Sequence, residues 1–349
     1  MLPIQFSVLL SFSAALVLPA PSRPPGGQAA LLRPLSERTS TNKAAKNPAN
    51  FVSAHGQLKV SGTQLVDKNG AKVVLRGMSY GWHSLWPRFY NEQTVKWLKK
   101  DFNCNVVRAA MGIEVGERCY KKDPAFSKEK IQAVVDGAIR SDIYVIIDWH
   151  SHNINQPEAK EFFGEMSRKY GKYPNIIYEV FNEPDHESWA EVKAYSEEVI
   201  KTIRQNDPDN IILVGSPHWD QDINLPAANP IKGYDNLMYT VHFYAATHGK
   251  QLRDRTDEAL NSGLPVFISE SAGMEASGDG PINPVAWQAY IDWMEAKGLS
   301  WITWSVSDKD ETCSILKKTA SSEGRWEDKD LKESGIKVRE YLRKYNTEK

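Results

Sequence analysis

The chain has 349 residues, of which 25% are charged and 41% hydrophobic, and its formal net charge is −1. This is the composition of an ordinary globular protein. The balanced charge gives no reason to expect a polyanionic partner such as nucleic acid or an anionic membrane surface. The chain has three cysteines, an odd number, so at least one thiol stays unpaired in a monomer, the oligomeric state that we expect.

The first 50 residues differ from the rest of the chain. Residues 1–20 contain the apolar run FSVLLSFSAALVL at 6–18, whose length suits a secretory signal peptide and is short for a membrane span. No Lys or Arg precedes this run, so an uncleaved anchor or a wrongly assigned start is the alternative. Residues 21–50 are rich in Pro, Ser, Ala, Lys and Asn without apolar periodicity, which indicates a disordered pro-segment or linker. We therefore expect a secreted protein with no membrane contact after signal removal and a catalytic domain over residues 51–349.

From residue 55 onward the sequence alternates between strand-like and helix-like segments. A β-hairpin comes first, with residues 57–60 and 64–67 on either side of Ser61-Gly62-Thr63. Eight strand-like runs follow, at 73–77, 105–111, 144–150, 176–183, 210–215, 237–242, 265–270 and 299–304. The amphipathic segments among them are 91–101, 127–141, 158–170, 188–205, 252–261, 284–296 and 332–345. Ser127 and Ser188 mark two helix starts, the second with a capping-box Glu191.

This alternation predicts an α/β fold, a single (β/α)₈ TIM barrel whose bottom is capped by the N-terminal hairpin. The strand-like runs are almost continuously apolar, as in Ile211-Ile212-Leu213-Val214, which suits strands of a parallel sheet covered on both faces. Eight such units over about 300 residues fit one barrel. A doubly wound open sheet is the alternative, but no Gly-x-Gly-x-x-Gly turn follows the first strand.

The strand positions also bear on the cysteines. Cys104 precedes a strand, whereas Cys119 and Cys313 follow strands and should lie near the opposite face. If one disulfide is present, Cys119–Cys313 is therefore the better pair.

Two of the strand-like runs end in a glutamate. The run at 176–183 stops at Asn182-Glu183-Pro184, where proline removes a backbone donor and ends pairing. The run at 265–270 stops at Glu270. Two carboxylates at the tips of two buried strands suggest acid/base and nucleophilic work on a glycosidic bond.

Active sites of such barrels lie at the C-terminal ends of the strands, and polar or aromatic residues gather there in this sequence. They are Arg108, His150, Asn182, Glu183, His242, Tyr244, Glu270 and Trp304. Each has a structural explanation when taken alone; Arg108, for example, would pair with a buried carboxylate such as Glu179. Packing is a poor explanation for the whole set, because buried polar groups cost free energy unless they are paired.

The Asn182-Glu183-Pro184 motif, with a second strand ending at Glu270, resembles glycoside hydrolase family 5, a cellulase family of retaining (β/α)₈ enzymes. The other segments that look like this family are RGMS at 76–79, VRAAM at 107–111, VIIDWH at 145–150, VHFYA at 241–245, ISE at 268–270 and WSVSDK at 304–309. The set is most similar to the family's secreted endo-β-1,4-glucanases and covers about residues 55 to 345.

The resemblance implies a retaining endo-β-1,4-glucanase that acts on internal bonds of β-1,4-glucan, without cofactor or metal ion. Glu183 corresponds to the general acid/base, Glu270 to the nucleophile and Asn182 to the residue that binds the sugar 2-hydroxyl. The supporting residues are Arg108, His242 and Tyr244, and the substrate-binding residues are His150, Trp219, Trp304, Trp82, His83, Lys309 and Glu311. The mechanism requires the pKa of Glu183 to be raised by burial and by the charge of Glu270, and Glu270 to stay ionised beside Arg108.

The sequence departs from the family pattern at two places. Ser271-Ala272-Gly273 follows the nucleophile where relatives have an aromatic residue and glycine. In the first loop, His83 does not align cleanly with the histidine of many relatives, and we expect it to take that role by a shifted route. Trp82 and Trp86 in the same loop are candidates for a sugar-stacking platform, and for Trp86 a core position is an equal alternative.

Other functions remain open at this stage. Related barrels cleave mannan, xyloglucan or mixed-linkage glucan with the same carboxylate pair. A metal-dependent hydrolase would use His150 and His152 with His242 and His248, and its remaining ligands would have to be Glu183 and Glu270. A barrel that only binds polysaccharide would be expected to lack Glu183 or Glu270. Because the barrel takes up the whole ordered length, we expect no separate carbohydrate-binding module, which favours soluble or amorphous glucan.

Overall fold

The computed structural model of the chain describes residues 50–347. The predicted signal peptide and all but the last residue of the predicted linker lie outside the described residues. Within them the prediction of a (β/α)₈ barrel is confirmed. Parallel strands close into one barrel, in the order β10-β3-β4-β5-β6-β7-β8-β9. These strands are β3 (Arg76–Tyr80), β4 (Val106–Gly112), β5 (Tyr144–His150), β6 (Ile176–Glu179), β7 (Ile211–Val214), β8 (Leu237–Tyr244), β9 (Val266–Ala272) and β10 (Trp301–Val306).

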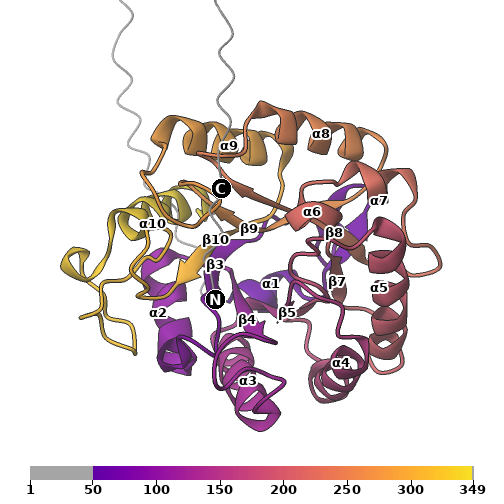
Figure 1. Ribbon diagram of the computed structural model, residues 1–349, viewed down its shortest axis with the longest axis horizontal. Coiled ribbons are helices and arrows are strands. Elements are labelled where there is room, and N and C mark those ends of the chain that lie inside the picture. The colour runs from indigo at the N-terminus through magenta and orange to yellow at the C-terminus, as the bar shows by residue number, and fades with distance from the viewer. Residues whose placement is uncertain (1–49, 348–349) are drawn as a thin grey trace, which may run out of the picture. The chain divides into compact units, whose positions relative to one another are not determined.

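Helices surround this barrel on all sides in the end-on view (Figure 1). They are α2 (Glu92–Phe102), α3 (Pro124–Arg140), α4 (Gln156–Tyr170), α5 (Trp189–Arg204), α6 (Pro217–Asp220), α7 (Asn224–Ala228), α8 (Lys250–Asn261), α9 (Pro284–Lys297) and α10 (Glu333–Tyr345), with 3₁₀ turns at Pro87–Phe89 and Asp328–Asp330. None of the helices in residues 50–347 is long and apolar enough to cross a membrane. The Ser188–Glu191 capping box is confirmed at the start of α5.

The barrel interior is layered, and the layers determine where polar side chains are placed. Alternate residues of a strand point to opposite faces. Along β5, Ile146 belongs to a buried apolar cluster at the bottom of the barrel, whereas Asp148 and His150 follow it towards the C-terminal end. Trp149 packs with the outer cluster that the helices cover. The polar groups inside the barrel therefore begin one layer above its apolar floor.

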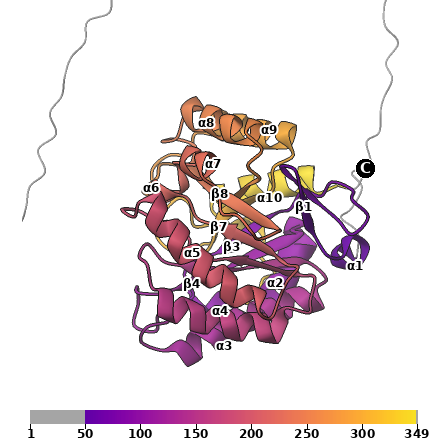
Figure 2. The same ribbon diagram turned by 90° about the vertical axis from the view of Figure 1, so that its right-hand side faces the viewer.

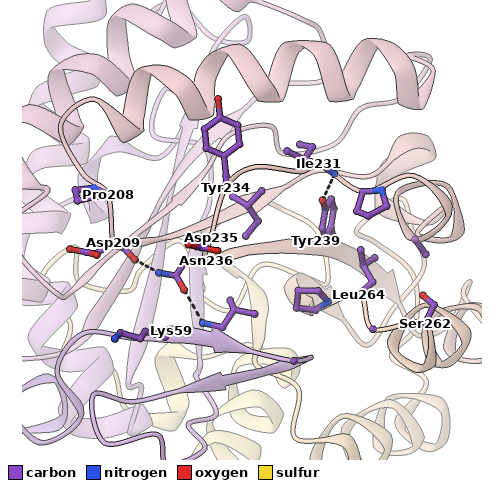
Figure 3. Close-up of a pocket in the computed structure, with 17 residues that line it drawn as sticks. Lys59, Pro208, Asp209, Ile231, Tyr234, Asp235, Asn236, Tyr239, Ser262 and Leu264 are labelled. Atoms are coloured by element: carbon purple, nitrogen blue, oxygen red, sulfur yellow. Dashed lines mark hydrogen bonds between the residues drawn. The ribbon is translucent and has the colours of Figure 1, made fainter.

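The N-terminal hairpin closes the floor, as predicted. Strands β1 (Lys59–Ser61) and β2 (Gln64–Val66) pair antiparallel, and Leu65 is buried in the same apolar cluster as Ile146. The short helix α1 (Phe51–His55) lies at this end of the barrel and α6 at the other end (Figure 2). A polar hydrogen bond ties the hairpin to the barrel, from the Val60 amide to Asn236 Oδ1 at 3.0 Å. A hollow of about 600 Å³ lies there, at the N-terminal ends of β7 to β9 and away from the polar layers (Figure 3).

Several predicted boundaries were wrong; strand β9, for example, runs on to Ala272, so Glu270 lies inside the strand rather than at its end. Three other boundaries differ for a local reason. The first barrel strand begins at Arg76 rather than at residue 73, because Val73 and Leu75 still pack on the barrel floor with the hairpin. Strand β6 ends at Glu179, so Glu183 lies beyond the pairing. Helix α3 begins three residues earlier than predicted, with Asp123 as its N-cap accepting from the Phe126 amide and Pro124 in its first turn.

The Cys119–Cys313 pairing was also wrong. Cys104, Cys119 and Cys313 are all free and buried. Cys313 Sγ donates instead to Glu311 Oε1 at 3.1 Å.

We therefore predict that all three thiols are titratable in the unfolded protein. Denaturing the protein without reductant in the presence of iodoacetamide should add three carbamidomethyl groups, because no thiol is held in a disulfide. Intact mass measurement reads this directly, with a reduced sample as the control. A product with one carbamidomethyl group would show that a disulfide exists.

Candidate active site

Arg108 on β4 is the centre of the polar layer. Its side chain is fully buried, and each guanidinium nitrogen has a partner. Nε donates to Glu179 at 2.6 Å, Nη1 to Glu270 at 3.0 Å and Nη2 to Asn182 Oδ1 at 2.7 Å. Nη2 also lies 3.0 Å from Asp148. The expected pairing with Glu179 is present, and the same guanidinium links four strands or strand ends.

Glu270 on β9 is held at both carboxylate oxygens. Arg108 Nη1 donates to Oε2, and the hydroxyl of Tyr244 donates to Oε1 at 2.7 Å. Ser271, the first departure from the family pattern, is buried and donates to the backbone carbonyl of Ile302 on β10 at 2.8 Å. Its side chain therefore supports the barrel wall beside the carboxylate.

Glu183, in the segment after β6, is hydrogen-bonded to His242 on β8. Glu183 Oε1 is 2.9 Å from His242 Nδ1, and His242 Nε2 is 2.8 Å from the Ser269 hydroxyl. An oxygen of Glu183 and an oxygen of Glu270 lie within 4.8 Å of each other. Carboxylates about 5–5.5 Å apart are typical of retaining glycosidases, whereas inverting enzymes need about 6.5–9.5 Å.

The pKa shifts of the two glutamates run in the directions opposite to those predicted. Burial by itself would raise the pKa of Glu183, but the hydrogen bond and the positive charge of His242 lower it. Burial and the charge of Glu183 raise the pKa of Glu270, against the opposing effects of His242 and Arg108. The pKa of His242 is raised well above its usual range, because Asp220, Glu179 and Glu183 outweigh the effect of burial. The pKa shifts of Glu183 and His242 both favour the proton on His242 rather than on Glu183.

A strained turn carries the residues that follow β7. His218, Trp219 and Asp220 are consecutive non-glycine residues with φ of 58°, 52° and 58°. Left-handed backbone costs roughly 1–2 kcal/mol per L-residue, so such a run must be held by its surroundings. The turn directs Trp219 outward, with 38% of its surface exposed, and leaves Asp220 fully buried.

Two hollows meet at the glutamate pair. The first, of about 300 Å³, is lined by both Glu183 and Glu270, and the second, of about 360 Å³, by Glu183 but not Glu270. The predicted residues that line the first hollow are Trp82, His150, Tyr244, Trp304, Lys309 and Glu311, and those that line the second are Trp219, His242 and Tyr244. Trp304 stacks on His150 with ring centroids 5.0 Å apart.

His83 is the predicted site residue that the structure does not bring to the cleft. It is fully buried, Nε2 is 2.8 Å from the Ser127 hydroxyl, and Nδ1 accepts from the Gly112 amide at 3.0 Å. The prediction that it contacts substrate was therefore wrong, since neither ring nitrogen faces the cleft. The same contact explains why Ser127 is buried inside α3 rather than capping it.

The histidines needed for a metal-dependent hydrolase are not gathered into one ligand set. Among residues 50–347, the group whose potential ligand atoms lie within 4.8 Å of one another is Glu183, His242 and Glu270. His150 Nδ1 is bonded to Asp148 at 2.7 Å, and His248 Nδ1 accepts from the Tyr244 amide at 2.8 Å. Both nitrogens of His242 are also in hydrogen bonds.

Sequence reasoning missed three acidic or basic residues of the site. Asp148 interrupts an apolar strand, a pattern that itself indicates a buried charge with a partner. His152 lies 3.7 Å from Glu183 and 6.2 Å, centroid to centroid, from the Trp82 ring. Asp220 gave no signal, because its position depends on the left-handed turn.

Comparison with known proteins agrees with this geometry. The sequence profile of the family described as Cellulase (glycosyl hydrolase family 5) matches residues 66–310. An endoglucanase from Clostridium saccharobutylicum is 42% identical over 316 residues, which are 88% of this chain and 69% of that protein. Endoglucanase A from Evansella cellulosilytica is 44% identical over 282 residues, 78% of this chain and 57% of that protein.

The chain belongs to glycosyl hydrolase family 5. It is therefore a glycoside hydrolase of the cellulase family, and it spans only part of the length of these two relatives. A solved structure from Cytophaga hutchinsonii is similar with a TM-score of 0.83 and 44% identity, covering 85% of this chain and 97% of that one. The catalytic domain of Thermobifida fusca endoglucanase Cel5A, solved in complex with cellotetraose, has a TM-score of 0.79 and 34% identity over 83% of this chain and 98% of that one.

The buried ion cluster predicts a large effect of Arg108 on the stability of this family 5 domain. Arg108→Met leaves Glu179, Asp148 and Glu270 buried without their cation, and we expect a loss of about 3–5 kcal/mol in the free energy of unfolding. Urea unfolding followed by tryptophan fluorescence measures it. Arg325→Met is the control, since Arg325 is 78% exposed and its ion pair with Glu323 is 3.9 Å long. That variant should stay within about 0.5 kcal/mol of the parent, and a similar loss in both variants would contradict the account.

Proposed function

We propose that the chain is a retaining endo-β-1,4-glucanase in which Glu270 is the nucleophile and Glu183 the general acid/base. The observation that carries the proposal is the short distance between their oxygens, within 4.8 Å, with a hollow on either side of Glu183. This separation fits a double displacement with a covalent glycosyl-enzyme intermediate.

We assign the two hollows to the two sides of the scissile bond. The nucleophile attacks the anomeric carbon, so the sugar that is attacked occupies the hollow lined by Glu270. The leaving sugar occupies the hollow beyond Glu183, where Trp219 offers an aromatic face. Because substrate extends into a hollow on both sides of the pair, the site suits bonds inside a glucan chain.

In the first step, Glu270 forms a bond to the anomeric carbon as Glu183 protonates the departing oxygen. Arg108 and Tyr244 fix the orientation of the Glu270 carboxylate. Arg108 also donates to Oδ1 of Asn182, which leaves the NH₂ group of that amide for the sugar 2-hydroxyl. In the second step, Glu183 accepts a proton from water, which attacks the glycosyl ester and releases Glu270.

Glu183 must receive its proton before the first step. Sugar that fills the cleft displaces water from Glu183, whose side chain is 14% exposed, and desolvation favours its neutral form. The proton then passes along the 2.9 Å hydrogen bond from His242 Nδ1 to Glu183 Oε1. Substrate binding thus turns the ionised Glu183 of the empty site into an acid.

The proposed substrate is β-1,4-glucan, and the proposed protein is a secreted monomer. The substrate rests on the endoglucanase relatives and on the aromatic and polar residues of the cleft. Secretion rests on the apolar run at 6–18, with residues 1–20 as the signal peptide and 21–50 as a linker before the catalytic domain at 51–349.

Carboxamide variants test the roles of the two glutamates. Glu270→Gln should lower kcat on carboxymethyl cellulose by on the order of 10⁴-fold or more, because no glycosyl ester can form. Glu183→Gln should lower it by about 10²–10⁴-fold, because the leaving oxygen is no longer protonated. Reducing-sugar release measures both.

Glu258→Gln on the exposed surface of α8 is the matched control and should keep the parent rate. A Glu270→Gln variant that hydrolysed carboxymethyl cellulose at the parent rate would overturn the proposed function.

A further inference from the structure

Asp220 is a buried carboxyl group with one satisfied and one unsatisfied oxygen. Its Oδ1 accepts from the Ser216 amide and from the Thr240 hydroxyl, the latter at 2.8 Å. Its Oδ2 has no hydrogen-bond partner within residues 50–347 and lies 3.3 Å from His242 Nδ1. The side chain is fully buried, where an unpaired polar atom costs free energy.

His242 Nδ1, which lies close to Asp220, is also the nitrogen that contacts Glu183, the proposed acid/base. His242 Nδ1 faces Glu183 Oε1 at 2.9 Å and Asp220 Oδ2 at 3.3 Å, so two carboxyl groups share one imidazole nitrogen. The left-handed turn at 218–220 brings Asp220 to this position from the segment after β7, the strand that pairs with β8. Buried and strained groups of this kind are retained where the surrounding structure holds them for function.

We propose that Asp220 is a positioning residue for catalysis, which holds the imidazole of His242 against Glu183 and retains the catalytic proton in that pair. The inference rests on the proposed role of Glu183 as acid/base. Burial raises the pKa of Asp220 well above its usual range, and the charge of His242 opposes this shift. When Asp220 is ionised beside the imidazole it favours a proton on Nδ1, because a neighbouring negative charge raises the proton affinity of an imidazole. Without it, the His242–Glu183 pair loses its proton at lower pH, and Glu183 has nothing to donate.

The other charged groups that face His242 and Glu183 come from each of the neighbouring elements. They are Glu179 from β6, Arg108 from β4, Asp148 from β5, Glu270 from β9, and His152, His218 and His248 from the loops and α6. Of the carboxyl groups in this set, Glu179, Asp148 and Glu270 are paired with Arg108. Asp220 has no such pairing, so its effect falls on His242.

Two aryl cellobiosides with the same sugar part and different leaving groups test the inference. Phenol is a poor leaving group and needs protonation by Glu183, whereas 2,4-dinitrophenolate leaves without a proton. Both fill the leaving-group side with a single ring, so the Trp219 platform contributes equally. The pH dependence of kcat/KM, which reports the free enzyme, is measured for each substrate with the full chain.

In Asp220→Asn, the alkaline limb for the phenyl substrate should move to lower pH by about one unit or more. One pH unit above the apparent pKa of the wild-type alkaline limb, kcat/KM of Asp220→Asn should then be about tenfold lower than that of the wild type. The dinitrophenyl substrate should change by less than about threefold, because its departure requires no proton. The position of the limb does not depend on the fraction of folded enzyme, so partial misfolding does not imitate this result.

Asp220→Ser is the second variant and should shift the limb in the same direction. Asp207→Asn is the matched control: Asp207 is equally buried, and its Oδ2 accepts from Tyr178 and Asn210, outside the site. Asp207→Asn should lower the stability of the protein and leave the pH profiles of kcat/KM for both substrates unchanged.

Glu183→Gln in the same assay separates the two claims. Large loss on the phenyl substrate with little loss on the dinitrophenyl substrate supports the proposed function, and equal loss on both overturns it. If Glu183→Gln discriminates while Asp220→Asn and Asp220→Ser keep the wild-type limb, or shift both substrates equally, the inference about Asp220 is overturned.

Discussion

The structure depends on one buried cation. Arg108 lies fully buried in a barrel layer that also holds Asp148, Glu179 and Glu270, and the negative charge of these groups could not be buried without it. Burial alone would raise the pKa of Glu179, yet the guanidinium and His242 hold it at about 2. The same group fixes the orientation of Glu270 and Asn182, so the interaction that makes the buried acids tolerable also builds the proposed catalytic geometry. Its position follows from the period of two along β4, since Arg108 points inward, as Val106 does on the floor.

The second buried cation divides the remaining acids. His242 interacts with Glu183, Asp220 and Glu179, whereas Glu270 is bonded to Arg108 and Tyr244. This division makes two chemically identical side chains unequal: one shares a proton with an imidazole and the other lies beside a guanidinium, which cannot give up its proton. The pKa shifts favour the shared proton on the imidazole, and in the proposed mechanism Glu183 becomes an acid once sugar replaces the water around it.

Much of this could be predicted from the sequence where local pattern decides the outcome. The apolar run at 144–150 predicted the bounds of β5 without error, and the two glutamates were found because each follows an apolar run, although Glu183 lies beyond β6 and Glu270 lies inside β9. Packing between distant segments decided the rest. His83 turned inward because Ser127 and the Gly112 amide satisfy its ring, and no spacing in the sequence reveals those partners. The directions of the pKa shifts of Glu183 and Glu270 were predicted the wrong way round, since both depend on His242, whose own pKa is raised by Asp220, and only the left-handed turn brings Asp220 to His242.

The central claim is that Glu270 forms a covalent bond to the sugar while Glu183 does not. The most direct measurement is mass spectrometry of the protein after incubation with 2,4-dinitrophenyl 2-deoxy-2-fluoro-β-cellobioside, whose fluorine slows both steps and whose leaving group favours the first. The account predicts one added fluorocellobiosyl group per chain, located by peptide sequencing on Glu270. A label on Glu183 or on any other residue would contradict it, and so would turnover that inverts the anomeric centre without a label.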